Sequence, residues 1–146
     1  MWTVEEARER LKSYGAKVTI QRLGILKLLE NRKNHPPAER IYSEMREYFP
    51  TISFATIYST AQLLQDAGLM QIITIDGKRV FFDPNPEVHG HFRCEGCGEI
   101  FDFPVEGKIV DELKSCAAHN VSRVQLYLYG LCSQCAEKVE AGSGRD

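Results

Sequence analysis

Four cysteines are well suited to metal chemistry, because they occur as two Cys-x-x-Cys pairs. Cys94 and Cys97 form the first pair, and Cys132 and Cys135 form the second. A tight turn at each pair can direct both sulfurs to one ion, and four thiolates complete the tetrahedral coordination of a structural zinc ion. The doubled spacing therefore predicts a closed zinc site with four cysteine ligands. Two disulfides or a redox pair are the alternative interpretations, although five cysteines cannot form a complete disulfide framework within one chain.

Two histidines next to the first cysteine pair need a different role. A zinc ion with four sulfur ligands has no vacant position for His89 or His91. Residues i and i+2 of a strand share one face, so this His-x-His motif can present two imidazoles to a second metal ion. On the motif alone, a pair of surface histidines is the alternative.

Length and composition limit the classes of protein to consider. The chain has 146 residues, of which 43% are hydrophobic and 26% are charged, which fits one domain or two small ones. No apolar run approaches a membrane span and no signal peptide opens the chain, so we expect a cytoplasmic protein without a membrane partner. The net charge is −2, but residues 1–83 carry 12 Lys and Arg against 10 Asp and Glu. This distribution permits DNA binding by the first half without requiring it.

The first half of the chain shows four stretches with apolar residues at helical spacing. Capping residues or a proline open these predicted helices: Thr3, Thr19, Pro37 and Ser53. The last helix covers residues 53–67, with Phe54, Ile57, Ala61 and Leu64 as its inner stripe. Two β-rich runs follow, Met70–Ile75 and Lys78–Phe82, and the Asp76-Gly77 between them predicts a hairpin.

Helices followed by a hairpin are the pattern of a winged helix. In that fold the helix over 53–67 would enter the major groove, and the hairpin would be the wing. Small, polar and aromatic side chains on its outer faces suit base edges and phosphates. A helical domain with a hairpin that contacts other proteins is the alternative. The residues expected to contact DNA are Arg22, Ser53, Thr56, Tyr58, Ser59, Lys78 and Arg79.

A proline-rich segment divides the chain. Asp83-Pro84-Asn85-Pro86-Glu87 carries two prolines within three residues, which discourage both helix and central strand. We therefore expect a first domain over 1–83, a hinge over 84–88 and a second domain over 89–146. The expected fold class is α+β: a winged-helix DNA-binding domain, then a small α/β domain with a structural four-cysteine zinc site.

Strand and helix signals alternate in the second domain. Strands are expected around Phe92 and over 100–103 and 121–131, and a short polar helix follows the second cysteine pair. A further helix has an apolar face made of Ile109, Val110, Leu113, Cys116 and Ala117. We therefore expect Cys116 to be a buried packing residue, with a redox role as the alternative.

These motifs together make the chain similar to a known family. It resembles the ferric uptake regulator family along essentially its whole length. The matching motifs are Thr19-x-Gln21-Arg22, His35-Pro36, Ser53-Phe54-Ala55-Thr56-Ile57-Tyr58, Ala67-Gly68-Leu69, His89-x-His91, Cys94-x-x-Cys97-Gly98, Tyr129-Gly130-Leu131-Cys132 and Cys135. The resemblance implies a homodimeric, metal-responsive repressor that binds double-stranded operator DNA and dimerises through its α/β domain.

The resemblance also implies a regulatory metal held by both domains. Its ligands map onto His35, Asp83, His89, His91 and Asp102. Three imidazoles and two carboxylates suit Fe²⁺ or Mn²⁺ better than a soft metal. Ligands on both sides of the hinge would make the metal a clamp that favours the DNA-binding conformation.

Asp102 distinguishes two branches of the family. Cys97-Gly98-Glu99-Ile100-Phe101-Asp102 is similar to the peroxide-sensing branch, which usually has Asp where the iron-sensing branch has Glu. The resemblance implies that Fe²⁺ reacts with hydrogen peroxide and that a ligand histidine, His35 or His89, gains oxygen, which opens the clamp. Mn²⁺ would repress without sensing peroxide. A repressor that responds to iron or manganese without physiological peroxide sensing is the main alternative.

Two further interpretations belong to other classes of protein. A metal-dependent enzyme could use the same His-x-His with an open coordination position, although the sequence lacks a deaminase signature and a Ser-His-Asp constellation. We therefore do not expect an enzyme. A thiol switch would instead oxidise the cysteine pairs and eject zinc, whereas zinc-bound sulfurs are usually protected.

Overall fold

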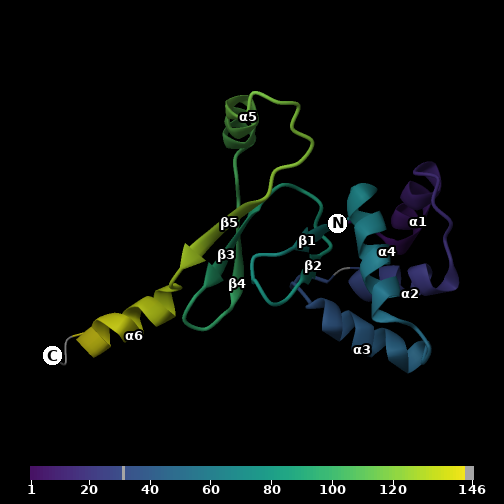
Figure 1. Ribbon diagram of the computed structural model, residues 1–146, viewed down its shortest axis with the longest axis horizontal. Helices are drawn as coiled ribbons and strands as arrows, with labels where there is room; N and C mark the ends of the chain where they lie inside the picture. Colours follow the sequence, from purple (N-terminus) through teal and green to yellow (C-terminus); the bar gives the residue numbers. More distant parts are fainter. Residues whose placement is uncertain (31, 144–146) are drawn as a thin grey trace. The chain divides into compact units, whose positions relative to one another are not determined.

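The computed structural model describes residues 1–30 and 32–143, and it divides into two compact units (Figure 1). The first unit is Met1–Pro86, and the second begins at Glu87. The elements of the first unit are α1 Val4–Ser13, α2 Ile20–Leu29, α3 Ala38–Tyr48, α4 Phe54–Asp66, β1 Gln71–Ile73 and β2 Phe81–Asp83. Among the described residues, no helix is long and apolar enough to cross a membrane. Helices followed by a two-stranded wing give this unit the predicted winged-helix architecture.

Side-chain caps fix where the helices of the first unit begin. Thr3 Oγ1 accepts a hydrogen bond from the Glu6 N–H at 3.2 Å, and the Glu6 carboxylate accepts one from the Thr3 N–H at 2.8 Å. Thr19 caps α2 and Ser53 caps α4 in the same way, by accepting from a backbone N–H in the first turn. These starts agree with the prediction. Pro37 differs by one position, since it is the N-cap of α3 rather than its first residue.

The core of the first unit lies where the four helices meet the wing. Leu11, Leu26, Ile41 and Leu64 are fully buried there, one from each helix. The Trp2 indole N–H donates to the Leu69 carbonyl at 2.6 Å, which attaches the start of the chain to the end of α4. Apolar side chains from distant parts of the sequence therefore share one continuous core.

The predicted inner stripe of α4 is wrong at its first residue. Ile57, Ala61 and Leu64 are buried, but the Phe54 side chain is 40% exposed. Its ring contacts the Tyr42 ring edge-on, with centroids 5.7 Å apart, at the rim of the core. The first turn of a helix extends past the helices it packs on, so helical periodicity overestimates burial at that end.

The wing is shorter than the two β-rich runs of the sequence. β1 and β2 pair antiparallel, with Ile72 opposite Phe82. Between them the Lys78 N–H donates to Asp76 Oδ1 at 2.9 Å, which closes the turn at the predicted Asp-Gly. The hairpin is confirmed, and Lys78 and Arg79 lie exposed in its loop.

The second unit is a three-stranded sheet with two helices. Its elements are β3 Gly90–Cys94, β4 Ile100–Phe103, α5 Gly107–Cys116, β5 Leu126–Gly130 and α6 Ser133–Ser143. The strand order is β4-β3-β5, with β3 antiparallel to β4 and parallel to β5. The strand predicted over 121–131 is confirmed only in its second part, since hydrogen bonding to β3 begins at Leu126. The helices and mixed sheet confirm the predicted α+β class.

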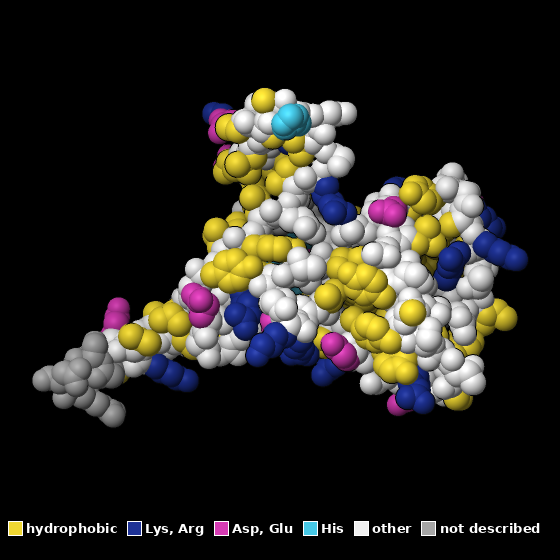
Figure 2. All heavy atoms as spheres, in the orientation of Figure 1, with side chains coloured by type: hydrophobic (Ala, Val, Ile, Leu, Met, Phe, Trp, Pro, Cys, Tyr) yellow, Lys and Arg dark blue, Asp and Glu magenta, His cyan; other side chains and the backbone are white. Residues whose placement is uncertain are grey.

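Apolar side chains of the second unit remain exposed on its helices. Figure 2 shows them on α5 and α6, where Ile109, Leu113 and Val139 are 42–57% exposed. Only Val110 of the apolar face predicted for α5 is buried. Cys116 is exposed, so its predicted burial is wrong. The physical reason is that the described residues leave most of this face uncovered.

The core of the first unit predicts that shortening a buried side chain of α4 lowers the stability of the protein. We expect Leu64→Ala to lower the free energy of unfolding by about 2–5 kcal/mol, because it leaves a cavity among fully buried side chains. Chemical denaturation followed by circular dichroism measures this. The matched control is Ile20→Ala, whose side chain is 74% exposed and should change stability by less than about 0.5 kcal/mol. Equal losses in the two variants would contradict this description of the core.

Candidate metal centres

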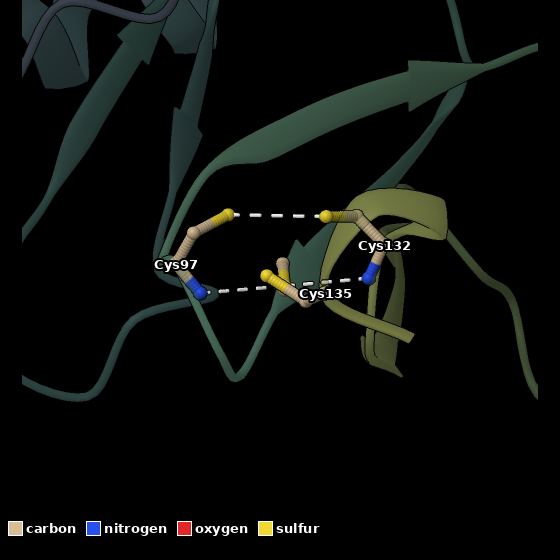
Figure 3. A group of neighbouring side chains, drawn as sticks. Cys97, Cys132 and Cys135 are labelled. Atoms are coloured by element: carbon tan, nitrogen blue, oxygen red, sulfur yellow. Dashed lines mark hydrogen bonds between the residues drawn. The ribbon is translucent and has the colours of Figure 1, made fainter. Parts of the chain in front are cut away.

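The four cysteines of the two Cys-x-x-Cys pairs meet in the second unit. Cys94 ends β3 and Cys97 lies in the turn before β4, whereas Cys132 follows β5 and Cys135 lies in the first turn of α6. Their four sulfurs lie within 4.8 Å of one another. Figure 3 shows the side chains of three of them, Cys97, Cys132 and Cys135, turned toward a common centre.

The sulfur spacing fits zinc and not a disulfide. Cys97 Sγ and Cys132 Sγ are 4.0 Å apart. Tetrahedral zinc with bonds of about 2.3 Å places its sulfurs about 3.8 Å apart. A disulfide would need about 2.0 Å, and all five cysteines are free. The geometry and the donor type therefore agree with the predicted structural zinc site.

Backbone N–H groups prepare Cys94 to be a thiolate. Its buried sulfur accepts hydrogen bonds from the N–H groups of Cys132 at 3.3 Å, Cys97 at 3.4 Å and Gly96 at 3.3 Å. These donors, with that of Cys132 contributing most, lower the pKa of Cys94 to about 6. The neighbouring sulfurs of Cys94 and Cys132 raise the pKa of Cys135 to about 12. Four thiolates this close need a dication among them, and zinc supplies that charge.

The second unit also brings together two histidines and a carboxylate. His91 lies on β3 directly opposite Asp102 on β4, and its Nε2 is 3.4 Å from Asp102 Oδ1. His89 precedes the strand on the same side, with its Nε2 3.6 Å from the same oxygen. The two imidazole centroids are 4.4 Å apart. The predicted sharing of a face by the His-x-His motif is therefore realised, with one carboxylate oxygen between the two rings.

The first unit brings together one histidine and one carboxylate. His35 Nε2 is 3.5 Å from Asp83 Oδ2. The segment before α3 runs along β2, since the Phe82 N–H donates to the Pro36 carbonyl at 2.9 Å. That hydrogen bond carries His35 to the end of β2, where Asp83 lies. Residues 48 positions apart in the sequence thus meet through backbone pairing.

Two supporting groups at these sites were not predicted from the sequence. The His89 Nδ1 lies 2.7 Å from the Glu87 carbonyl oxygen, which can only accept, so Nδ1 carries a hydrogen and Nε2 is the nitrogen left to bind a metal. The Asn85 N–H donates to Asp83 Oδ1 at 3.0 Å, which turns the other oxygen toward His35. Outer partners of this kind orient metal ligands. The Asp-x-Asn spacing was a usable signal for the second bond.

Three of the residues expected to contact DNA gather at the start of α4. Ser53 Oγ accepts from the Thr56 N–H at 3.1 Å, and its hydroxyl lies 2.9 Å from that of Thr56. The Ser59 hydroxyl donates to the Thr56 carbonyl at 3.2 Å. Ser53 and Thr56 therefore shape the end of the helix, where N–H groups can also approach a phosphate. Tyr58 is half-buried on the same helix.

The remaining residues expected to contact DNA belong to other elements. Arg22 lies in the first turn of α2, and its Nη1 donates to the Lys17 carbonyl at 2.6 Å. Lys78 and Arg79 lie in the wing loop, where the Arg79 guanidinium is 5.2 Å from the Phe81 ring centroid. The seven residues thus come from three elements of the first unit.

Comparison with known proteins supports the resemblance seen in the sequence. The model of the ferric uptake regulator family matches residues 13–129. The peroxide operon regulator of Bacillus subtilis (strain 168) is 37% identical over 139 residues, which span 92% of this chain and 94% of that protein. Among solved structures, the peroxide-sensing PerR from Streptococcus pyogenes matches with a TM-score of 0.54 and 28% identity, covering 92% of this chain and 94% of that one. The ferric uptake regulator from Pseudomonas aeruginosa with manganese matches with a TM-score of 0.67 and 26% identity, over 87% and 98%.

The cysteine cluster predicts that zinc holds the second unit together. We expect the Cys94→Ser protein to lose the bound zinc, because Cys94 joins β3 to the start of α6. Without zinc, most of the cooperative unfolding transition of the second unit should disappear. Metal analysis after gel filtration measures the zinc content per chain. Cys116→Ser is the matched control, since this exposed cysteine lies outside the cluster and its variant should keep one zinc per chain. A folded, zinc-loaded Cys94→Ser protein would contradict the structural role.

Proposed function

The chain belongs to the ferric uptake regulator family, and we propose from this premise that it is a dimeric transcriptional repressor that binds operator DNA with Fe²⁺ or Mn²⁺ and is released by peroxide. The observation that carries the proposal is that His35, His89 and His91 each turn Nε2 toward a carboxylate oxygen. Nitrogen and oxygen donors in this ratio suit Fe²⁺ and Mn²⁺.

The regulatory ion would take ligands from both units. The pair His35 and Asp83 offers two donors, and the group of His89, His91 and Asp102 offers three. Neither set alone completes the coordination that Fe²⁺ or Mn²⁺ prefers, whereas the two together give five donors. An ion bound by both sets would favour the conformation in which both are close. Metal binding would thereby select the DNA-binding arrangement of the units.

Peroxide release would act on the imidazoles of this set. When bound, Fe²⁺ supplies the redox chemistry that turns hydrogen peroxide into an oxidant of nearby groups. One oxygen of hydrogen peroxide would then be inserted into a ring C–H bond of His35 or His89, which becomes C–OH, while the second peroxide oxygen leaves as water with the two peroxide hydrogens. The modified ring is a poorer ligand, so the units would separate and the operator would be released. Identity of 37% to a peroxide operon regulator supports this branch.

A second copy of the chain would cover the apolar surfaces of the second unit. Ile109 and Leu113 on α5 and Leu128 on β5 are 42–54% exposed in a single chain. Exposed apolar surfaces of this kind mark protein interfaces. A homodimer would bury them and present two winged helices to two half-sites of the operator.

Contacts to DNA would come from α4, the wing and the start of α2. In a winged helix the recognition helix lies in the major groove, where Tyr58 and Ser59 would reach base edges. Lys78 and Arg79 in the wing and Arg22 on α2 would bind phosphates, as would Ser53 and Thr56 at the N-terminus of α4. A repressor of chromosomal genes would work in the cytoplasm.

The clamp predicts that His35 is needed for regulation and not for folding. We expect the His35→Ala protein to keep its zinc and its native circular dichroism spectrum. The factor by which Mn²⁺ raises its operator affinity should be smaller by about tenfold or more, because one imidazole ligand is missing. Fluorescence anisotropy with labelled operator DNA, with and without Mn²⁺, measures this. His119→Ala is the matched control, because this histidine is exposed and lies outside both ligand groups. An unchanged Mn²⁺ response in His35→Ala would exclude His35 as a ligand.

Peroxide sensing predicts a specific mass change. After the zinc-loaded protein receives Fe²⁺ and a small dose of hydrogen peroxide, we expect one added oxygen on the peptide containing His35 or His89, found by peptide mass mapping. The Mn²⁺-loaded sample and the peptide containing His119 should stay unmodified. Asp102→Glu should keep metal-dependent DNA binding and reduce the oxidation.

Two other results of this experiment would favour a different function. Unmodified histidines in an iron-loaded sample would favour an iron- or manganese-responsive repressor without peroxide sensing. Oxidised cysteines together with loss of zinc would favour a thiol switch.

A further inference from the structure

Gly90, between the ligands His89 and His91, has very little space for a side chain. A Cβ built on Gly90 would lie 2.0 Å from Cζ and 2.1 Å from Cε2 of the Phe103 ring. Contacts this short do not occur between real atoms, so the ring lies directly against the glycine backbone. Gly96, which has the next closest contact among the described glycines, would place its Cβ 3.0 Å from a neighbour.

The ring and the imidazoles lie on opposite faces of the sheet. Gly90 is directly opposite Phe103 in the pairing of β3 with β4, and the next pair is His91 opposite Asp102. Side chains of successive residues point to opposite faces of a strand. The Phe103 ring therefore supports the backbone of β3 from behind, at the residue that separates the two histidines.

A glycine inside a strand needs a physical reason. It weakens the strand, because it contributes no side-chain packing and has the greatest backbone freedom. An aromatic ring from the neighbouring strand can compensate by covering the glycine. Here the ring lies against the residue that links His89 to His91, so it restrains the backbone between them.

We propose that Phe103 packed on Gly90 is a positioning pair for the regulatory metal site. It holds β3 and β4 so that the Nε2 atoms of His89 and His91 lie 3.6 Å and 3.4 Å from one oxygen of Asp102. The pair supplies no ligand atom and would set the metal affinity through the strand geometry. This inference rests on the proposed function, because it assumes that these three residues bind the ion.

The test is the Mn²⁺ affinity of the zinc-loaded full-length protein, measured by the electron paramagnetic resonance of free Mn²⁺. In Gly90→Ala the new methyl group displaces the ring, and we expect the affinity to fall by about tenfold or more, as for other changes behind metal ligands. The matched control is Gly130→Ala on β5, whose Cβ would meet Phe92 at an ordinary 3.4 Å. This control should stay within about twofold of the unmodified protein.

A double variant separates displacement of the ring from a general effect of alanine in the strand. Phe103→Ala alone should also weaken Mn²⁺ binding by about tenfold. Gly90→Ala with Phe103→Ala should bind no worse than Phe103→Ala alone, because no ring remains to be displaced. Losses that multiply in the double variant would overturn the pairing. If Gly90→Ala does not fold, Phe103→Ala decides alone, and unchanged Mn²⁺ affinity in that variant would overturn the proposal.

Two failures can be told apart in the same experiment. An unmodified protein that binds no Mn²⁺ would contradict the proposed function itself. Unmodified and Gly90→Ala proteins that bind Mn²⁺ equally, both with full zinc content, would leave the function standing and remove only the positioning role.

Discussion

The pairing of β3 with its two neighbours is the constraint on which the second unit depends. Alternation along this one strand directs His91 to one face and Phe92 to the other, and the strand ends at Cys94. Zinc ligation at the end of β3 fixes the same backbone that carries the imidazoles. A shift in register by one residue would exchange the faces and separate His91 from Asp102. Loss of the structural ion would therefore also disturb the second metal site.

In the first unit, backbone pairing and the hydrophobic core hold the corresponding pair of residues in place. Backbone pairing of Pro36 with Phe82 brings His35 to Asp83, and the hydrophobic core behind β2 keeps that strand in place. The wing would thus have two roles in the proposed function, since its loop carries the basic residues Lys78 and Arg79 and the end of β2 carries the proposed ligand Asp83.

Local signals in the sequence predicted most of the fold and the cysteine cluster, whereas the second group of proposed ligands came from the family resemblance. Helix caps, the Asp-Gly turn and the cysteine spacing depend on neighbours a few residues away, so Thr3, Thr19 and Ser53 were identified correctly as caps. The errors have a common cause in tertiary context. Cys116 is exposed because the apolar spacing of a helix does not determine whether another element covers that face. The contact of Phe103 with Gly90 crosses two strands, and periodicity within one strand cannot reveal it.

The two ligand sets divide the chemistry between a protected and a reactive centre. Four thiolates around zinc, which has no redox chemistry, would react slowly with peroxide, because their lone pairs bind the ion. Imidazoles and carboxylates favour ions that exchange and, for iron, change oxidation state. An oxidant formed at the proposed iron site would arise among imidazole ligands, whereas the sulfurs belong to the other group. On the proposed function, the segregation of donor types, more than the presence of any one residue, would direct oxidation to histidine and spare the zinc on which the fold of the second unit depends.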